Sequence, residues 1–500
     1  MPLCPSPSVT LRTFSIMAIA ILEYIQNGML NFASSYVMGG IGAAPEEFSY
    51  AAMAYALCAV LALFNHRWCS ERFGSKRFVQ LSLLLYATGA LCCACAQTPW
   101  AFIIGRAIQG MGGATFFTTA RIEVNRQEGK RRVMMLLCFG YALLLGSALG
   151  PLLGSLAISL ESWRWIFWGM MPWILAAAWA STSLSEEKPQ QPTSYHPGAF
   201  ICLVIAVFAL QFLIQQTPYD WFGQPGWLVL LLLLALFSGL LFQIRHRRTA
   251  SDLRHWRQLA QARYLFGLSF YFVCYFLVAA NSYIMPVMVQ QALSFTVPTT
   301  GLLLSVSYLA GILFATVYAR LQLRFQRTWL RPSMILGCLL LAGFDAQMIV
   351  LDDRTPLARV AAILVLNGGF VAIFIAAVAQ GTFREIEETA FAHAYQTKNI
   401  IRQIAISSAT AVSVVFLQAR NALHYARLSE GFSLDNPIFN NSLAQLRQAL
   451  PQLDQNQSIL LLAQRLAQQS TLLSCLDYFQ FELWMALALA AWIFVQKRFI

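Results

Sequence analysis

The stretch GSALGPLLGS (residues 146–155) places a glycine at every fourth position, with a proline directly after the second one. The segment around it is long and apolar and carries no charged residue. Glycines four positions apart share one face of a helix and let a neighbouring helix approach closely. The proline removes a backbone hydrogen bond and kinks the helix. The stretch therefore predicts a kinked, closely packed membrane helix, and the residues concerned are Gly146, Gly150, Pro151 and Gly154.

The whole chain has the composition of a membrane protein. Of its 500 residues, 58% are hydrophobic and only 11% are charged, whereas a typical soluble domain has about 25% charged residues. A membrane helix needs roughly 20 apolar residues. Fourteen segments of this kind lie near 12–36, 48–65, 78–97, 101–121, 133–158, 164–184, 197–216, 226–244, 264–291, 299–320, 331–350, 358–381, 396–418 and 475–496. We therefore expect an all-α membrane protein with about fourteen transmembrane helices. Arg402, Gln403 and three serines interrupt the thirteenth segment, so twelve or thirteen spans are the alternative.

The basic residues follow the alternation of the loops. Lys and Arg cluster in the connections after the second, fourth, eighth and tenth segments, while the loops GGIGAAPEEFS, QTPW, QQTPYDWFGQPG and LSFTVP carry none. Cytoplasmic loops are enriched in Lys and Arg, so the pattern predicts that both termini are cytoplasmic, in a bacterial inner membrane. These loops account for the net charge of +12, and we expect no nucleic-acid partner.

The chain lacks the sequence signatures of common enzymes and metal sites. The run CCAC (residues 92–95) has no histidine or carboxylate beside it, so we predict no metal site there. We find no phosphate-binding GxxxxGK[ST] loop, no HExxH and no nucleophile elbow. We expect no enzymatic activity, no cofactor and no direct use of ATP.

Further stretches have a recognisable order. The connection after the second segment reads RWCSERFGSKR (residues 67–77), a basic turn at Gly74 that would lie against the anionic inner leaflet. The fourth segment contains RAIQGMGGA (residues 106–114), and an arginine inside a membrane usually faces a cavity or a carboxylate. The others are SWRWIFWGMMP (162–172), YIMPVMVQQALSFTVPTTGLLL (283–304) and YQTKNIIRQIAISS (395–408).

In this order and spacing the stretches resemble the major facilitator superfamily, and in particular its fourteen-span drug/proton antiporter (EmrB-like) branch. The resemblance implies two six-helix bundles, residues 1–190 and 263–500, around a central cavity. It places two inserted transmembrane helices and a cytoplasmic loop at 191–262, and it implies alternating access to a site near the membrane midplane. The chain departs from the family pattern at Arg67 and Glu71, where Gly and Asp are usual.

A carboxylate lies in the middle of the first apolar segment. In LEYIQNGMLNFASS, Glu23, Asn27 and Asn31 are four apart and would share one helix face. A charge at this depth costs on the order of 2.5–3.5 kcal/mol by insertion scales. A protonatable acid that faces a cavity avoids much of this cost and can carry a coupling proton. The alternative for all three residues is hydrogen bonding across helices.

Other polar and aromatic residues are candidates for the same cavity. Arg106 would tune the carboxylate as an electrostatic partner or act as a structural counter-ion. Tyr271 and Tyr275 of the ninth segment would form a wall suited to flat lipophilic cations, or would face lipid. The expected substrate cavity comprises Asn27, Asn31, Gln109, Tyr271, Tyr275 and Asn367.

The resemblance also implies conformational roles. The glycines and proline of residues 146–155 would form a hinge and close-packing seam between helices. Glu71, Arg72, Gly74, Lys76 and Arg77 would form a cytoplasmic gate, the alternative being a solvated basic turn that sets topology.

Four more polar residues lie within apolar segments. We expect Asp345 and Glu482 to face outer water near the ends of their helices. Arg402 and Gln403 would contact lipid headgroups or a partner at the inner gate.

One outer connection, residues 419–474, is long and rich in Gln and Leu. Its apolar spacing indicates amphipathic helices that lie at the outer surface or dock on a partner. A simple extracytoplasmic cap is the alternative.

The sequence thus favours a proton-coupled secondary transporter that exports drugs or other amphipathic toxic compounds. Its partners would be a small-molecule substrate, protons and the lipid bilayer. By resemblance, a periplasmic adaptor and an outer-membrane channel would complete the pathway. The alternatives are a transporter of a narrow physiological solute, a transporter-like sensor without flux and a passive channel.

Overall fold

The computed structural model describes residues 7–184, 197–220, 223, 225–249, 260–325, 329–431, 436–450, 452 and 454–496. Among these residues every regular element is a helix. The first half of the chain forms α1 (Pro7–Phe32), α2 (Ser34–Ile41), α3 (Pro45–Phe73), α4 (Ser75–Cys95), α5 (Pro99–Asn125), α6 (Gly129–Ser159), α7 (Trp165–Trp168) and α8 (Met171–Ser181). α9 (Pro197–Asp220) and α10 (Pro225–Thr249) follow. The second half forms α12 (Ala262–Val287), the π-helix η1 (Met288–Ala292), α13 (Val297–Phe325), α14 (Leu330–Met348), α15 (Leu357–Thr382), α16 (Glu388–Ser429), α17 (Pro437–Ala449) and α18 (Gln455–Val495).

Each of the fourteen apolar segments coincides with a helix. Within the described ranges, eleven helices are long and apolar enough to cross a membrane by length and composition alone. The three remaining segments fall on α5, on α7 with the short α8, and on α14. The all-α membrane fold expected from the sequence is therefore confirmed.

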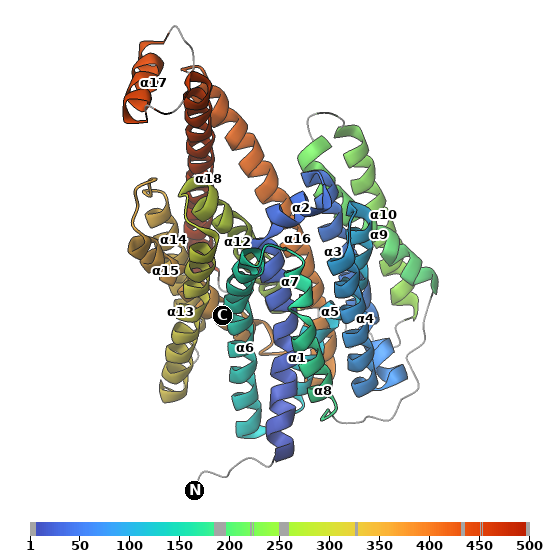
Figure 1. Cartoon of the computed structure of the whole chain (residues 1–500). Helices are drawn as coiled ribbons and strands as arrows, with labels where there is room; N and C mark the ends of the chain where they lie inside the picture. The colour runs from blue at the N-terminus through green and yellow to red at the C-terminus, as the bar shows by residue number, and fades with distance from the viewer. Residues whose placement is uncertain are drawn as a thin grey trace.

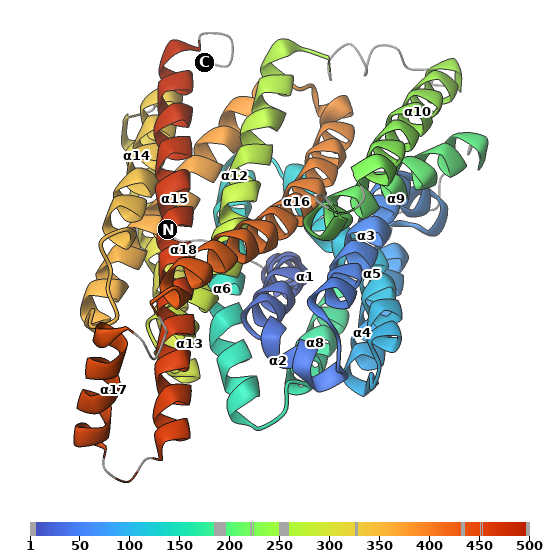
Figure 2. The same cartoon turned by 90° about the horizontal axis from the view of Figure 1, so that it is seen from above.

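The helices pack as two groups that meet at the centre of the molecule. In the first group α1 packs on α5, α6 and α8, and α3 and α4 pack on α5. In the second, α15 contacts α13 and α14, while α18 contacts α14 and α16. The groups meet where α6 contacts α13, α1 contacts α12 and α16 contacts α3. Figure 2 shows α9 and α10 together at one edge, where α9 packs on α3 and α16.

The glycine-rich stretch of α6 lies against α1. A Cβ atom added to Gly150 would lie 2.7 Å from the Cα of Gly28, so the two backbones touch. Gly146 and Gly154 also face α1, where an added Cβ would lie 2.8 Å from Ile21 Cγ1 and 3.2 Å from Met29 Cα. Only residues without a side chain permit this approach, which explains the four-residue spacing in the sequence.

The long connection expected at the outer side, residues 419–474, is mostly helical where the structure describes it. α16 and α18 both continue beyond the membrane-spanning part, and α17 joins them at the top of Figure 1. α16 and α18 pack on each other, and Asp477 Oδ2 accepts hydrogen bonds across this contact from Arg420 at 2.7 Å and from His424 at 2.6 Å. The segment expected as a separate outer loop is therefore largely built from extensions of two transmembrane helices.

Candidate functional site

A central cavity of about 1060 Å³ lies between the two groups of helices. Its lining comes mainly from α1, α3, α5 and α6 on one side and from α12, α13, α15 and α16 on the other, and α2 and α9 also contribute. Of the residues expected here, Asn27, Asn31, Tyr271, Tyr275 and Arg106 line the cavity.

Two of the expected cavity residues lie elsewhere. Gln109 is fully buried on α5, where its Oε1 accepts a hydrogen bond from Arg106. Asn367 lines a small separate pocket of about 20 Å³ and donates to Ser307 Oγ at 3.3 Å. Both side chains bond within their own group of helices, which is an ordinary structural use of an intramembrane amide.

Glu23 forms a buried ion pair that joins the two groups. Arg402 of α16 donates to both carboxylate oxygens of Glu23, at 2.9 and 3.0 Å. Gln403 donates to the same carboxylate at 3.1 Å, and Tyr55 does so at 3.4 Å. The Glu23 and Arg402 side chains are 1% and 4% exposed. A carboxylate held this way is oriented and charge-compensated inside the protein.

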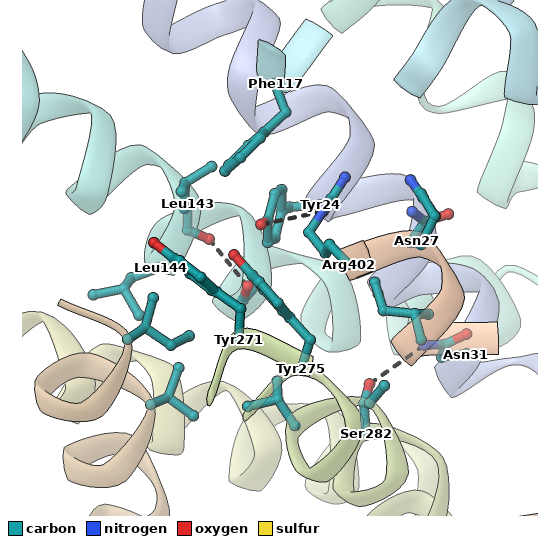
Figure 3. A pocket seen from close by; sticks show the side chains of 18 of the residues that line it. Tyr24, Asn27, Asn31, Phe117, Leu143, Leu144, Tyr271, Tyr275, Ser282 and Arg402 are labelled. Atoms are coloured by element: carbon teal, nitrogen blue, oxygen red, sulfur yellow. Dashed lines mark hydrogen bonds between the residues drawn. The ribbon is translucent and has the colours of Figure 1, made fainter. Parts of the chain in front are cut away.

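The position of Arg402 corrects the expectation that it contacts headgroups or the inner gate. Its guanidinium lies at the centre of the protein, over the ring of Phe117 at 4.8 Å and beside the hydroxyl of Tyr24 at 3.3 Å. The reason is that Glu23 offers a partner which compensates the charge in the interior. Figure 3 shows Tyr24 and Arg402 meeting at the cavity wall.

Arg106 does not contact Glu23 directly. Its guanidinium lies over the ring of Tyr55 at 4.2 Å, and its Nη1 donates to Gln109. Tyr55 in turn donates to Glu23, so it stands between the arginine and the carboxylate. Arg106 therefore reaches the carboxylate through an aromatic ring and a hydroxyl group.

Lys398 is a site residue that the sequence analysis did not single out. It is 1% exposed, and its Nζ lies 4.4 Å from the ring centre of Phe117, 4.9 Å from that of Tyr271 and 4.8 Å from that of Tyr395. Its one hydrogen bond to a described residue goes to Asn399 Oδ1, at 3.1 Å. The sequence spacing could have identified it, because positions 398 and 402 are four apart and two cations at this spacing share one face of a helix.

The cavity wall on α12 is aromatic. Tyr271 and Tyr275 stack face to face, as Figure 3 shows. Their ring centres are 5.8 Å apart, and the angle between the ring planes is 10°. Two turns further along the helix, Ser282 accepts a hydrogen bond from Asn31 of α1 at 3.4 Å. This bond is a second polar link across the cavity between the two groups of helices.

The C-terminal end of α3 contacts α16. Arg67 donates to Glu71 at 2.7 Å and also contacts His393 of α16. Gln396 donates to the backbone carbonyl of Phe64 at 2.9 Å. Of the expected gate residues, Glu71 takes part through its bond to Arg67, which was not among the residues expected in the gate. The contacts of Arg67 and Gln396 link the two groups of helices at this end.

The other expected gate residues have local roles. Gly74 has a positive φ of 81° at the junction of α3 and α4, a conformation that suits glycine. Arg72 lies over the ring of Trp68, 5.5 Å from its centre. Lys76 and Arg77 make no hydrogen bond or ion pair with any residue that the structure describes.

Asp345 and Glu482 are buried, not exposed to outer water as the sequence suggested. Both are 0% exposed, enclosed by α12, α14 and α18. Asn281 donates to Glu482 Oε1 at 2.9 Å and accepts from Tyr478 at 3.0 Å. The expectation rested on their distance from the helix ends, which does not reveal that neighbouring helices cover them.

The comparisons with known proteins agree on the family. The sequence pattern of the Major Facilitator Superfamily matches residues 16–409. The Multidrug export protein EmrB of Haemophilus influenzae is 21% identical over 94% of this chain and 92% of its own length. The Multidrug resistance protein 3 of Bacillus subtilis is 23% identical over 83% of this chain and 80% of its own length.

Solved structures show the same fold. A bacterial homologue of the human lysosomal transporter Spinster, in an inward-facing and unoccupied conformation, superposes with a TM-score of 0.61 at 11% identity. It covers 99% of this chain and 98% of its own. The xylose transporter XylE of E. coli, partially occluded and inward open, gives a TM-score of 0.54 at 13% identity over 81% of this chain and 91% of its own.

Proposed function

The chain belongs to the Major Facilitator Superfamily, and from this premise we propose that it is a proton-coupled exporter of amphipathic compounds. The matched relatives include proteins named for multidrug export and resistance, and this favours export of toxic compounds. A cavity of about 1060 Å³ is large enough for a drug-sized molecule. We place the protein in a bacterial inner membrane with both termini in the cytoplasm.

The observation that carries the proposal is the Glu23–Arg402 pair between the two groups of helices. Glu23 belongs to α1 and Arg402 to α16, so the pair is a contact between the halves. A proton that binds Glu23 would neutralise the carboxylate and remove most of its attraction for the guanidinium. Because such pairs are strong only when both charges are present, protonation would weaken this contact between the halves.

This chemistry would couple proton movement to alternating access. With Glu23 charged, the pair ties α1 to α16; with Glu23 protonated, the guanidinium can turn to a substrate in the cavity. Arg106 would influence the carboxylate through Tyr55 rather than by direct pairing. Rocking of residues 1–190 against 263–500, with 191–262 carried as an insert, would then expose the cavity to each side in turn.

The remaining predicted groups have roles in this scheme. The close-packed α1–α6 seam at Gly150 would serve as the hinge. The contact of Arg67 with α16 and that of Gln396 with α3 would form the inner gate. Both contacts would break when the cavity opens to the cytoplasm. The helical projection of α16, α17 and α18 is where a periplasmic adaptor, leading to an outer-membrane channel, would dock.

Proton release from acidified everted vesicles tests the proposal. A pH-sensitive dye reports the release as amphipathic compounds of either charge, and small metabolites, are added one by one. We expect at least one amphipathic compound to release protons from vesicles that contain the wild-type protein and not from those that contain Glu23→Gln at matched expression. Equal release by both proteins would refute the role of Glu23. Release by metabolites alone would favour a transporter of a narrow solute.

A further inference from the structure

The central cavity has a strong excess of positive charge. Among the described residues that line it there is no aspartate or glutamate. Six cationic side chains line it: Arg106, Arg121, Arg132, Lys398, Arg384 and Arg402. We propose, on the premise that the protein is an exporter, that the cavity binds lipophilic organic anions, namely flat aromatic carboxylates or sulfonates. This reverses the sequence-based expectation of lipophilic cations.

Glu23 cannot balance this excess. Its carboxylate lies behind the cavity wall, and both of its oxygens already accept hydrogen bonds from Arg402. One carboxylate compensates one guanidinium, so Glu23 leaves the other five cations uncompensated; of these Arg106 and Lys398 are buried, while Arg132 and Arg384 are exposed. A cationic substrate would meet several like charges and no free carboxylate in the cavity, and such an arrangement opposes binding.

Lys398 is the centre of the proposed anion site. It is 1% exposed and surrounded by the rings of Phe117, Tyr271, Tyr275 and Tyr395, with Nζ 4.4 to 5.1 Å from the ring centres. Its single hydrogen bond to a described residue goes to a neutral amide, although an ammonium group can donate three. The remaining donors of a buried cation are suited to the oxygens of an anionic ligand.

Two arginines that line the same cavity add unused donors. The Nη1 atom of Arg121 is buried without a hydrogen-bond partner, and its guanidinium lies over the rings of Phe391 and Tyr395 at 5.1 and 5.7 Å. The Nε atom of Arg106 is also buried and unpartnered. Buried polar groups normally have partners, so unused donors that line one cavity point to a ligand rich in acceptors.

The aromatic wall fits the body of such a ligand. Tyr271 and Tyr275 present parallel rings, and Tyr24 and Phe117 lie across from them, as Figure 3 shows. A flat aromatic body can stack on these rings while its carboxylate or sulfonate lies near Lys398. The same rings that shield the lysine from water would therefore hold the apolar part of the substrate.

An anionic substrate has a consequence for energy coupling. A monovalent anion that leaves the cell and a proton that enters it both move positive charge inward. One-for-one exchange therefore transfers two charges per cycle, whereas exchange of a monovalent cation for a proton transfers none. A membrane potential that is negative inside would drive the anion exchange, in addition to the pH gradient.

Three matched probes test the inference: 2-naphthoate, 2-naphthamide and 2-naphthylmethylammonium, which share one aromatic body and differ in charge. Binding is measured by calorimetry on the purified full chain in detergent. We expect naphthoate to bind at least ten-fold more tightly than the ammonium probe. Lys398→Gln should weaken naphthoate binding at least ten-fold and leave naphthamide binding within about two-fold, while Lys398→Arg should restore it. Arg427→Gln, which removes an exposed charge from the same helix outside the cavity, should change none of these values.

The outcomes separate this inference from the proposed function. Tighter binding of the ammonium probe, equal binding of the charged probes, or binding of none of the three would overturn the anion site. In proteoliposomes with a voltage-sensitive dye, naphthoate should build an electrical potential as it exchanges with protons. Selective binding of naphthoate without proton movement would overturn the exporter proposal and keep the anion site. Proton movement driven by the ammonium probe alone would overturn the anion site and keep the exporter proposal.

Discussion

Neutralising one partner of the Glu23–Arg402 pair should destabilise the protein more than neutralising both. Arg402 donates to both carboxylate oxygens at 2.9 and 3.0 Å, and the two side chains are 4% and 1% exposed. Removing one charge from a buried pair of this kind costs about 3–5 kcal/mol, because the other charge is left without compensation. We expect Glu23→Gln and Arg402→Gln each to lower the free energy of unfolding by this amount.

The double variant should recover much of the loss. Two glutamines can hydrogen-bond to each other, and no buried charge remains, so the double variant should be more stable than the less stable single variant. Because each single variant loses about 3–5 kcal/mol and the double variant loses less than the worse of them, the interaction energy in the double-mutant cycle should be at least about 3 kcal/mol. Reversible unfolding of the purified protein by SDS in mixed micelles measures all four proteins.

A control comes from the outer projection. The pair between Arg420 and Asp477 has a similar distance of 2.7 Å, but its side chains are 39% and 21% exposed. Exposed pairs contribute about 0–1 kcal/mol, so the same cycle on this pair should give a small interaction energy. Additive effects at Glu23 and Arg402, within about 0.5 kcal/mol, would show that the pair does not exist in the folded protein.

The remaining predictions concern packing, a buried acid and the outer projection. Gly150→Ala places a Cβ 2.7 Å from the Cα of Gly28, and should lower the SDS-unfolding free energy by about 1–3 kcal/mol. Gly39→Ala, where a Cβ meets nothing within 4 Å, should have little effect; equal losses would contradict the seam. Glu482→Gln keeps the bond to its asparagine partner, so it should shift the unfolding free energy by less than about 1.5 kcal/mol, and a larger loss would show that the buried charge itself is needed. Deletion of residues 436–470 should leave transport by the reconstituted protein intact and abolish resistance in cells; loss in both settings would count against adaptor docking.

The sequence predicted the fold well because apolar length and loop charge act locally. All fourteen segments found by hydropathy contain helices. The glycine spacing predicted that residues 146–155 approach a neighbouring helix closely, although it did not show that this helix is α1. Local patterns did not reveal where the helices continue beyond the membrane. The extension of α16 to Ser429 packs along α18, with Arg420 bonded to Asp477, and no local pattern in the sequence records this pairing.

The site was predictable in part. A carboxylate in an apolar helix stands out in any sequence, and so Glu23 was a candidate from the start. Its partner Arg402 lies 379 residues away, and sequence position says nothing about such a contact. Arg106 was the expected partner, yet Tyr55 lies between the guanidinium of Arg106 and the carboxylate of Glu23. The charge of the cavity depends on which of many cations face inward, and this follows only from the packing of six or more helices.

The most direct test of the central claim is proton coupling in reconstituted vesicles. Proteoliposomes with the wild-type protein, Glu23→Gln or Glu482→Gln are given an acidic interior, and uptake of a compound that releases protons in the everted-vesicle assay is followed with and without the pH gradient. Glu482 is a suitable control because it is also a membrane-helix glutamate, at 0% exposure, and does not line the cavity. The account predicts that the pH gradient accelerates uptake by the wild type and by Glu482→Gln, and has no effect on uptake by Glu23→Gln. Acceleration that persists in Glu23→Gln would contradict the account.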